Sequence, residues 1–280
     1  MTSLALILMM QFVVSTRAGL VNYVQGAANI KATTSVPAGA PIETGPGGTV
    51  EILLNPGSYL RLGENSGAVL DKTELTDMAL HITHGSAVIE AKGFEKKSPL
   101  QVTAGTRKME IISDGVYSIS DDKVIVIDGK IRDAETGVIY KKGYEISDDG
   151  ALKTNLAATP LEIWSRNRSE QIAAANVNIA NSLRNNPNVP LNVWLWAPAF
   201  GAFVYMPPWG YRSPYGYVYR SVGTYYRTIQ PAPPRASGVR SPASGAGSAA
   251  GGASRPASPQ VSAPRMSHPP VGGRSIPSRR

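Results

Sequence analysis

The chain contains no cysteine and only three histidines in 280 residues. The absence of cysteine excludes a disulfide framework, a thiolate zinc site and a thiol nucleophile. The Gly-x-Ser-x-Gly elbow, the phosphate-binding loop and the His-Glu-x-x-His pattern are also absent. His81 and His84 are three positions apart, which places them on opposite faces of a strand. We therefore expect a non-enzymatic protein with no catalytic residue, no cofactor and no metal site.

Acidic residues are absent after Glu170. Residues 1–170 carry 17 basic and 20 acidic side chains, whereas residues 171–280 carry 11 arginines, so the formal charge of +8 comes from the C-terminal part. Residues 231–280 have no aromatic residue, and 36 of these 50 positions are Ala, Gly, Pro or Ser. Such a segment buries too little apolar surface to offset its ordering entropy. We predict a disordered tail that contacts anionic polymers electrostatically, and no specific binding of nucleic acid.

Long hydrophobic runs are missing as well. The apolar run from Leu4 to Val14 has 11 residues, and a spanning helix needs about 20, so we expect no transmembrane span. The run matches the core of a secretory signal, with a small residue at Ala18, although no positive charge precedes it. We predict that residues 1–18 are a signal peptide or signal-like segment; the alternative is a buried first strand or helix. A signal implies an exported protein, which is periplasmic, outer-membrane-associated or extracellular.

Residues 19–155 alternate between short apolar runs and turn residues. Asn55-Pro56-Gly57 separates the runs 49–54 and 58–62, and Gln25-Gly26 is interpreted as a hairpin turn between residues 21–23 and 28–30. Asp-Gly and Lys-Gly pairs separate further runs up to residue 150. Strands that recur every 8–12 residues with such turns predict a mainly β sandwich, roll or barrel.

Three consecutive segments resemble the core of a known domain. They are the strand Pro99–Thr103, the strand Gly115–Ile119 and the hairpin from Val124 to Lys130, and their order and spacing resemble the FecR domain. The segment from Glu51 to Ser66 is similar to the leucine-turn-Gly-Ser hairpin of that family. The resemblance covers about half of the chain and is closest to exported bacterial FecR-domain proteins. It implies an antiparallel β-sandwich or β-roll.

The resemblance also implies a type of activity. Well-known FecR proteins sense a liganded outer-membrane receptor in the periplasm and signal to a cytoplasmic sigma factor. That role needs a cytoplasmic segment and a spanning helix before the β domain, and we expect neither here. The expected function is therefore a non-catalytic protein-interaction or scaffold module of the cell envelope. Its expected partner is an unidentified envelope protein or cell-wall polymer.

One long helix is predicted at residues 159–186. Thr159 can cap it, Pro160 fits its first turn, and Glu162 completes a capping box. Apolar residues recur at helical spacing and predict a face that packs on the β domain, while Arg168 is expected on another face. The members of this stripe are Leu161, Trp164, Ile172, Ala175, Ile179 and Leu183.

Residues 187–230 form a segment rich in aromatic residues, proline and glycine. Positions 191–226 hold 12 aromatic residues, and no apolar run there is long enough for a spanning helix. The rings either pack against the body as irregular chain or present a surface for glycan, wall or protein contact. The candidate interaction surface consists of Trp194, Trp196, Tyr205, Trp209, Tyr211 and Tyr217. A cell-wall or glycan-binding protein that uses these rings is the alternative function.

Overall fold

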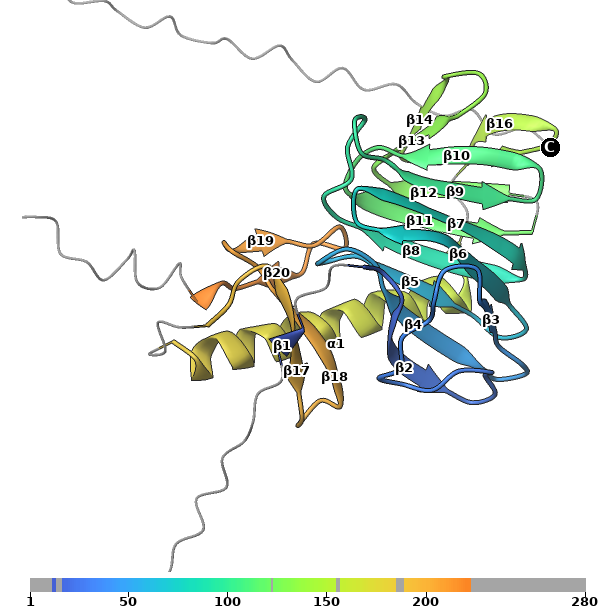
Figure 1. The fold of residues 1–280 in the computed structure, drawn as a ribbon. Helices are drawn as coiled ribbons and strands as arrows, with labels where there is room; N and C mark the ends of the chain where they lie inside the picture. Colours follow the sequence, from blue (N-terminus) through green and yellow to red (C-terminus); the bar gives the residue numbers. More distant parts are fainter. Residues whose placement is uncertain (1–11, 14–16, 122, 155–156, 185–188, 223–280) are drawn as a thin grey trace, which may run out of the picture. The chain divides into compact units, whose positions relative to one another are not determined.

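The computed structural model describes residues 12–13, 17–121, 123–154, 157–184 and 189–222. Two large sheets dominate the described part of the chain, as expected for a mainly β protein (Figure 1). The larger sheet has eight strands. Their order is β16 (Gly150–Lys153), β15 (Tyr144–Ser147), β12 (Lys123–Asp128), β11 (Gly115–Ser120), β8 (Ser86–Ala91), β5 (Tyr59–Leu62), β4 (Thr49–Leu53) and β2 (Leu20–Gln25).

The second sheet has seven strands and packs on the first. Their order is β14 (Ile139–Lys141), β13 (Lys130–Asp133), β10 (Arg107–Ile111), β9 (Leu100–Ala104), β7 (Asp77–His84), β6 (Gly67–Glu74) and β3 (Pro41–Glu43). Neighbouring strands in both sheets are antiparallel, except that β7 and β9 are parallel. This topology confirms the expected sandwich-like class and adds one parallel pair to it.

The main core lies between the two sheets. Strand alternation sends Val50 and Ile52 of β4 and Leu60 and Leu62 of β5 into this core, where all four are fully buried. The odd-numbered residues of β5 point to the other face of the sheet, and they are buried too. The larger sheet is therefore covered on both faces at β4, β5 and β8.

The helix α1 (Pro160–Ser182) covers that outer face (Figure 1). Thr159 caps it: the Thr159 hydroxyl accepts a hydrogen bond from the Glu162 amide, and the Glu162 carboxylate accepts one from the Thr159 amide. The predicted capping box and helix are thus confirmed. No helix in the described ranges is long and apolar enough to cross a membrane.

A smaller lobe packs against the same buried face of α1 and against the larger sheet. It contains β17 (Val193–Ala197), which pairs with β18 (Ala202–Met206) on one side and with β1 (Phe12–Val13) on the other. It also contains a two-stranded hairpin of β19 (Tyr211–Arg212) and β20 (Val218–Tyr219). The predicted irregular segment is therefore partly ordered as strands. Most of the predicted signal segment 1–18 and all of the predicted tail 231–280 lie outside the described residues.

The predicted hairpin at Gln25-Gly26 is wrong. Strand β2 pairs with β4 instead, and Ala28 forms an isolated bridge with Thr44. Gly26 has a positive φ of 68° and lies against the backbone of Gly47, so the chain turns there toward the 45–48 loop. The turn at residues 55–57 does join β4 to β5, as predicted.

Candidate functional site

A cluster of charged side chains lies between the larger sheet and α1. Glu51 on β4 and Arg61 on β5 are directly opposite each other in the hairpin register, and both side chains are fully buried. Arg61 Nε donates to Glu51 Oε2 at 2.8 Å, and Arg61 Nη1 donates to Glu90 Oε2 on β8 at 2.9 Å. One buried guanidinium therefore joins carboxylates from two strands.

The helix supplies the other half of this cluster. Arg61 Nη1 also donates to Ser165 Oγ at 2.8 Å, and Ser169 Oγ donates to the Glu90 carboxylate. Arg168 Nε donates to Glu51 Oε1 at 3.2 Å. The buried charged cluster thus consists of Glu51, Arg61, Glu90 and Arg168, with the two serines between them.

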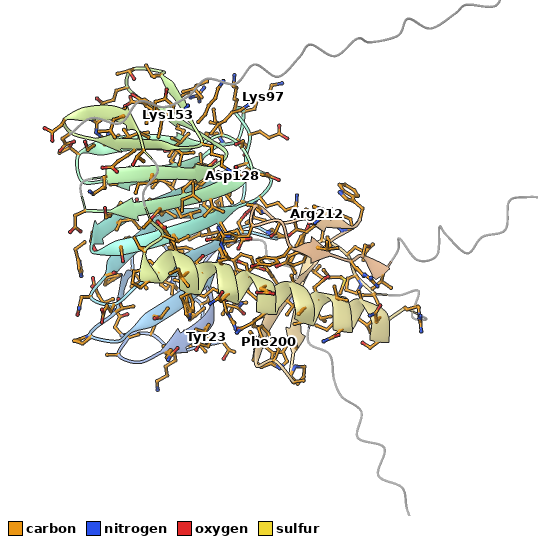
Figure 2. All side chains as sticks on the ribbon, turned by 180° about the vertical axis from the view of Figure 1, so that it is seen from behind. Tyr23, Lys97, Asp128, Lys153, Phe200 and Arg212 are labelled. Atoms are coloured by element: carbon orange, nitrogen blue, oxygen red, sulfur yellow. The ribbon has the colours of Figure 1, made fainter. Side chains whose placement is uncertain are left out.

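Arg168 lies at the contact between the sheet and the helix, so the expectation that it faces elsewhere is wrong. Its guanidinium carbon lies 4.6 Å from the ring centroids of both Tyr23 and Phe200. Figure 2 shows these two rings near each other beside the helix. The buried face of α1 is largely polar, because ion pairs and hydrogen bonds replace the apolar contacts that the stripe predicts. Its buried members are Ser165, Arg168, Ser169, Ile172, Ala173, Asn176 and Ala180.

The two carboxyl groups of the cluster have opposite pKa shifts. Burial by itself raises the pKa of Glu51, but the guanidinium groups of Arg61 and Arg168 outweigh it, and the pKa is lowered. Burial also raises the pKa of Glu90, and there the single ion pair with Arg61 and the bond from Ser169 leave it raised. Glu51 is therefore the firmly ionised member of the cluster, held between two cations.

Two buried asparagines attach the smaller lobe to the larger sheet and to α1. Asn22 Nδ2 donates to Glu51 Oε1 at 2.8 Å and to the Phe203 carbonyl at 3.1 Å. Asn176 on α1 donates to the Tyr205 carbonyl at 2.9 Å and accepts from the Arg220 amide at 2.7 Å. The charged cluster and these asparagines were not among the predicted site residues. The signal for the cluster was the presence of a Glu and an Arg within otherwise apolar strands on either side of a predicted turn.

The six candidate aromatic residues lie in different environments. Trp194 is fully buried and Tyr205 is 3% exposed, and their ring centroids are 5.7 Å apart in a second core. Trp196, Tyr211 and Tyr217 are half-buried, whereas Trp209 is 68% exposed. The structure therefore places one of the six on the open surface and two in the interior. As an interaction surface, the set remains a prediction.

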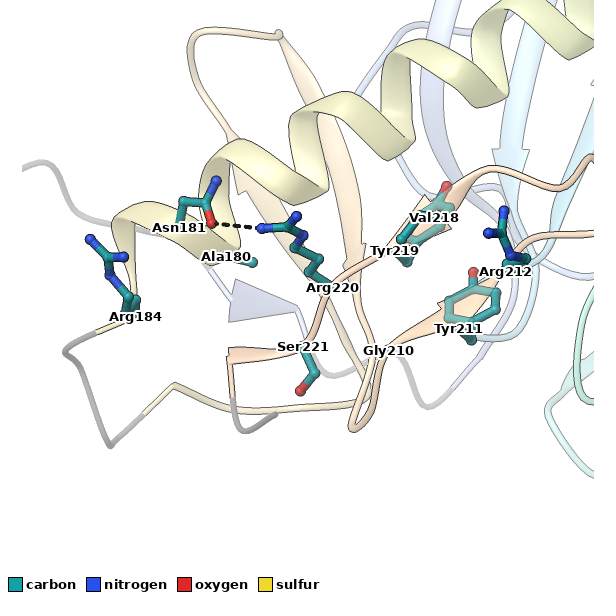
Figure 3. A pocket seen from close by; sticks show the side chains of 10 residues that line it. All are labelled: Ala180, Asn181, Arg184, Gly210, Tyr211, Arg212, Val218, Tyr219, Arg220 and Ser221. Atoms are coloured by element: carbon teal, nitrogen blue, oxygen red, sulfur yellow. Dashed lines mark hydrogen bonds between the residues drawn. The ribbon is translucent and has the colours of Figure 1, made fainter. Parts of the chain in front are cut away.

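A groove runs between the end of α1 and the β19–β20 hairpin (Figure 3). Its volume is about 480 Å³, and Arg184, Arg212 and Arg220 line it together with Tyr211 and Tyr219. The two tyrosine rings stack with centroids 4.9 Å apart. The groove combines cationic side chains with a packed aromatic wall.

The two histidines of the β domain pair with carboxylates separately. His81 Nδ1 lies 2.8 Å from Asp71 Oδ1, and His84 Nε2 lies 3.3 Å from Glu43 Oε2. Within the described ranges, no group of three or more His, Cys, Asp or Glu side chains could hold a metal ion.

The fold defines the class of this molecule as a double-sheet β domain with a docked helix. The family model described as "FecR protein" matches residues 40–132, from β3 to β13. This chain therefore contains a FecR domain, as its motifs predict. A search of the curated proteins found no match.

Two solved structures also match. Both are described as "a putative anti-sigma factor from Parabacteroides distasonis ATCC 8503". Each is 15% identical to this chain with a TM-score of 0.37. The match to the first structure spans 68% of this chain and 90% of the matched chain. The match to the second spans 59% of this chain and 82% of the matched chain.

Proposed function

We propose that this protein is a non-catalytic FecR-domain module of the bacterial cell envelope that binds another protein outside the cytoplasm. The FecR domain at residues 40–132 supports the assignment to an interaction module. The buried charged cluster joins the FecR domain to α1 through the Arg168–Glu51 ion pair and the hydrogen bonds of Ser165 and Ser169.

The observation that carries the proposal is an exposed apolar end of the β domain. Edge strand β14 and the loop before it expose Ile139 and Val138, which are 37% and 48% exposed. Edge strand β16 exposes Leu152, which is 56% exposed. The rings of Tyr140 on β14 and Tyr144 on β15 lie 5.9 Å apart and link the two sheets at this end. Exposed apolar side chains on open strand edges are a typical surface for pairing with another chain.

The test uses the full chain, fused to an affinity tag and crosslinked in living cells. We expect a defined envelope protein to be crosslinked to the wild type and lost from the double variant Ile139→Asp/Leu152→Asp. The matched control is Ile163→Asp, since Ile163 is 52% exposed but lies on α1. Equal capture by all three proteins would contradict the proposed surface, and the absence of any defined partner would contradict the interaction function.

Export is part of this proposal. Residues 1–25, fused to a reporter that is active only after translocation, are expected to make the reporter active. A silent reporter would contradict the assignment to the envelope.

A second function is binding to cell-wall glycan, and the exposure of Trp209 favours it. A flat aromatic face in solvent can stack on a sugar ring. We expect sedimentation with purified peptidoglycan to be lost in Trp209→Ala and largely kept in Trp209→Phe. Point variants are preferable to deletion of residues 191–226, because that segment contains the core residues Trp194 and Tyr205. Unchanged sedimentation of Trp209→Ala would remove this candidate.

A further inference from the structure

Two arginines of the groove at the end of α1, Arg212 and Arg220, bind neutral acceptors among the described residues. Arg212 Nη1 donates to the Gly216 carbonyl at 3.1 Å, and Arg220 Nη1 donates to Asn181 Oδ1 at 3.4 Å (Figure 3). Both acceptors are neutral. In the part of the chain that the structure describes, no carboxylate lies within ion-pair distance of either guanidinium. Both side chains are exposed.

The arginines of the β domain behave differently. Arg107 pairs with Asp133 and Asp148, and Arg132 pairs with Glu110. Arg61 is paired twice within the charged cluster. Arg212 and Arg220 differ from these arginines in that their hydrogen-bond acceptors are neutral. Guanidinium groups bind carboxylates with paired hydrogen bonds, so exposed arginines that lack an acidic partner favour an acidic ligand.

The walls of the groove favour an acidic peptide over an acidic sugar. Tyr219 is buried, and it stacks on Tyr211. The ammonium nitrogen of Lys92 lies 4.5 Å from the centroid of the Tyr211 ring. These contacts occupy the aromatic rings that a sugar would need for stacking. Val218 also lines the groove, and its exposed side chain offers an apolar contact of the kind that a peptide side chain makes.

The tail of this chain has the wrong charge to fill the groove. Residues 223–280 contain eight arginines and no acidic side chain. Like charges repel at an exposed site, so charge complementarity favours an acidic segment of another molecule over the tail.

We propose that this groove binds an acidic segment of a protein partner, with carboxylates paired to Arg212 and Arg220 and an apolar side chain on Val218. This inference rests on the proposed function as a protein-interaction module. It assigns that partner a chemistry: an exposed stretch in which Asp or Glu alternates with apolar residues.

The test measures fluorescence anisotropy with the full chain and a labelled 12-residue peptide of alternating Glu and Leu. The probe is compared with its Gln-for-Glu counterpart. We expect the acidic peptide to bind and Arg212→Gln/Arg220→Gln to weaken binding by about tenfold or more. The matched control is Arg235→Gln/Arg240→Gln, which removes the same charge from the tail and should weaken binding by less than about threefold. The single variant Arg220→Gln serves if the double variant does not fold.

Several results would overturn the inference. They are equal losses in the groove and tail variants, equal binding of the neutral peptide, or groove-dependent binding of oligogalacturonate that is tighter than that of the peptide. The crosslinking experiment keeps this test separate from the proposed function. If the groove variants still capture the envelope partner, the groove inference fails and the interaction function stands.

Discussion

Asn22 on β2 and Phe203 on β18 exchange two hydrogen bonds across 181 positions of the chain. Asn22 Nδ2 donates to the Phe203 carbonyl at 3.1 Å, and the Phe203 amide donates to Asn22 Oδ1 at 2.6 Å. Asn22 is fully buried and also donates to Glu51. One side chain therefore links the first strand of the β domain, the charged cluster and the smaller lobe.

Replacement of Asn22 by alanine should destabilise this link. Asn22→Ala leaves the Phe203 amide and carbonyl buried without their partner, and each such group costs about 1–3 kcal/mol. We expect the free energy of unfolding in urea to fall by about 2–4 kcal/mol. The amide of Phe203 should also exchange faster with deuterium. The control Asn178→Ala alters an exposed asparagine of α1 and should change neither measurement.

The charged cluster predicts a contrast between two glutamates. Glu51→Gln leaves Arg61 and Arg168 without their shared anion in a buried site, and we expect a loss of about 3–5 kcal/mol in unfolding free energy. Glu110→Gln removes a partly exposed partner of Arg132 and should cost about 0–1 kcal/mol. Equal losses in the two variants would show that burial of the cluster does not govern its contribution.

The opposite pKa shifts of Glu51 and Glu90 predict opposite pH dependences. The unfolded pKa of Glu is about 4.3. Because the pKa of folded Glu51 is lowered, its stabilisation is complete above that pH and is lost as the pH falls through the folded value. The difference in unfolding free energy between wild type and Glu51→Gln should therefore shrink below about pH 4.3.

Glu90 behaves in the reverse sense, since its raised pKa means that the folded state takes up a proton first as the pH falls. Proton uptake by folded Glu90 stabilises the folded wild type as the pH falls, whereas Glu90→Gln has no carboxyl group to protonate. The difference between these two proteins should widen as the pH falls from the raised folded pKa toward about 4.3. Urea titrations between pH 3 and 8 measure both differences, and trends of the same sign would contradict the assignment.

Gly26 and Gly39 provide a matched pair of glycines with positive φ, 68° and 79°. A Cβ on Gly26 would lie 2.2 Å from the Gly47 carbonyl oxygen, whereas one on Gly39 meets nothing within 4 Å. Gly39→Ala should cost about 1–2 kcal/mol from backbone strain alone. Gly26→Ala should cost clearly more, because the 45–48 loop must also move. Thermal unfolding of both variants tests this order.

Trp194 and Trp209 should differ strongly in their effect on stability. Trp194→Ala removes a fully buried ring and should cost about 3–5 kcal/mol. Trp209→Ala should change the unfolding free energy by no more than about 0.5 kcal/mol, since its side chain is largely in solvent. Urea unfolding followed by circular dichroism measures both. A large loss in Trp209→Ala would assign that ring to the core.

The local elements could be predicted from the residues because their signals are local. Thr159, Pro160 and Glu162 specify where α1 begins, and Asn55-Pro56-Gly57 specifies the turn between β4 and β5. Both depend on hydrogen bonds and backbone angles within a few residues. The Gln25-Gly26 turn could not be predicted in this way, because the partner of β2 is a later strand and pairing between distant segments is a tertiary choice.

The buried face of α1 was likewise decided by the tertiary structure. An apolar stripe predicts contact through residues such as Trp164 and Ile179, which are half-buried. The strands under α1 present Glu51, Arg61 and Glu90, so the helix meets them with Arg168 and two serines. A desolvated charge must be paired, and only the folded chain shows which distant side chain pairs with it.

By itself, the sequence determined the β class, the FecR domain, the start of the helix and the separation of an acidic body from a basic C-terminal region. The FecR domain follows from the resemblance of its motifs to that family, and the other three follow from composition or from contacts within a few residues. The tertiary structure decided which strands pair, which face of α1 is buried and which aromatic rings reach solvent. Those outcomes depend on residues up to 181 positions apart, whose contacts form only when the chain has packed.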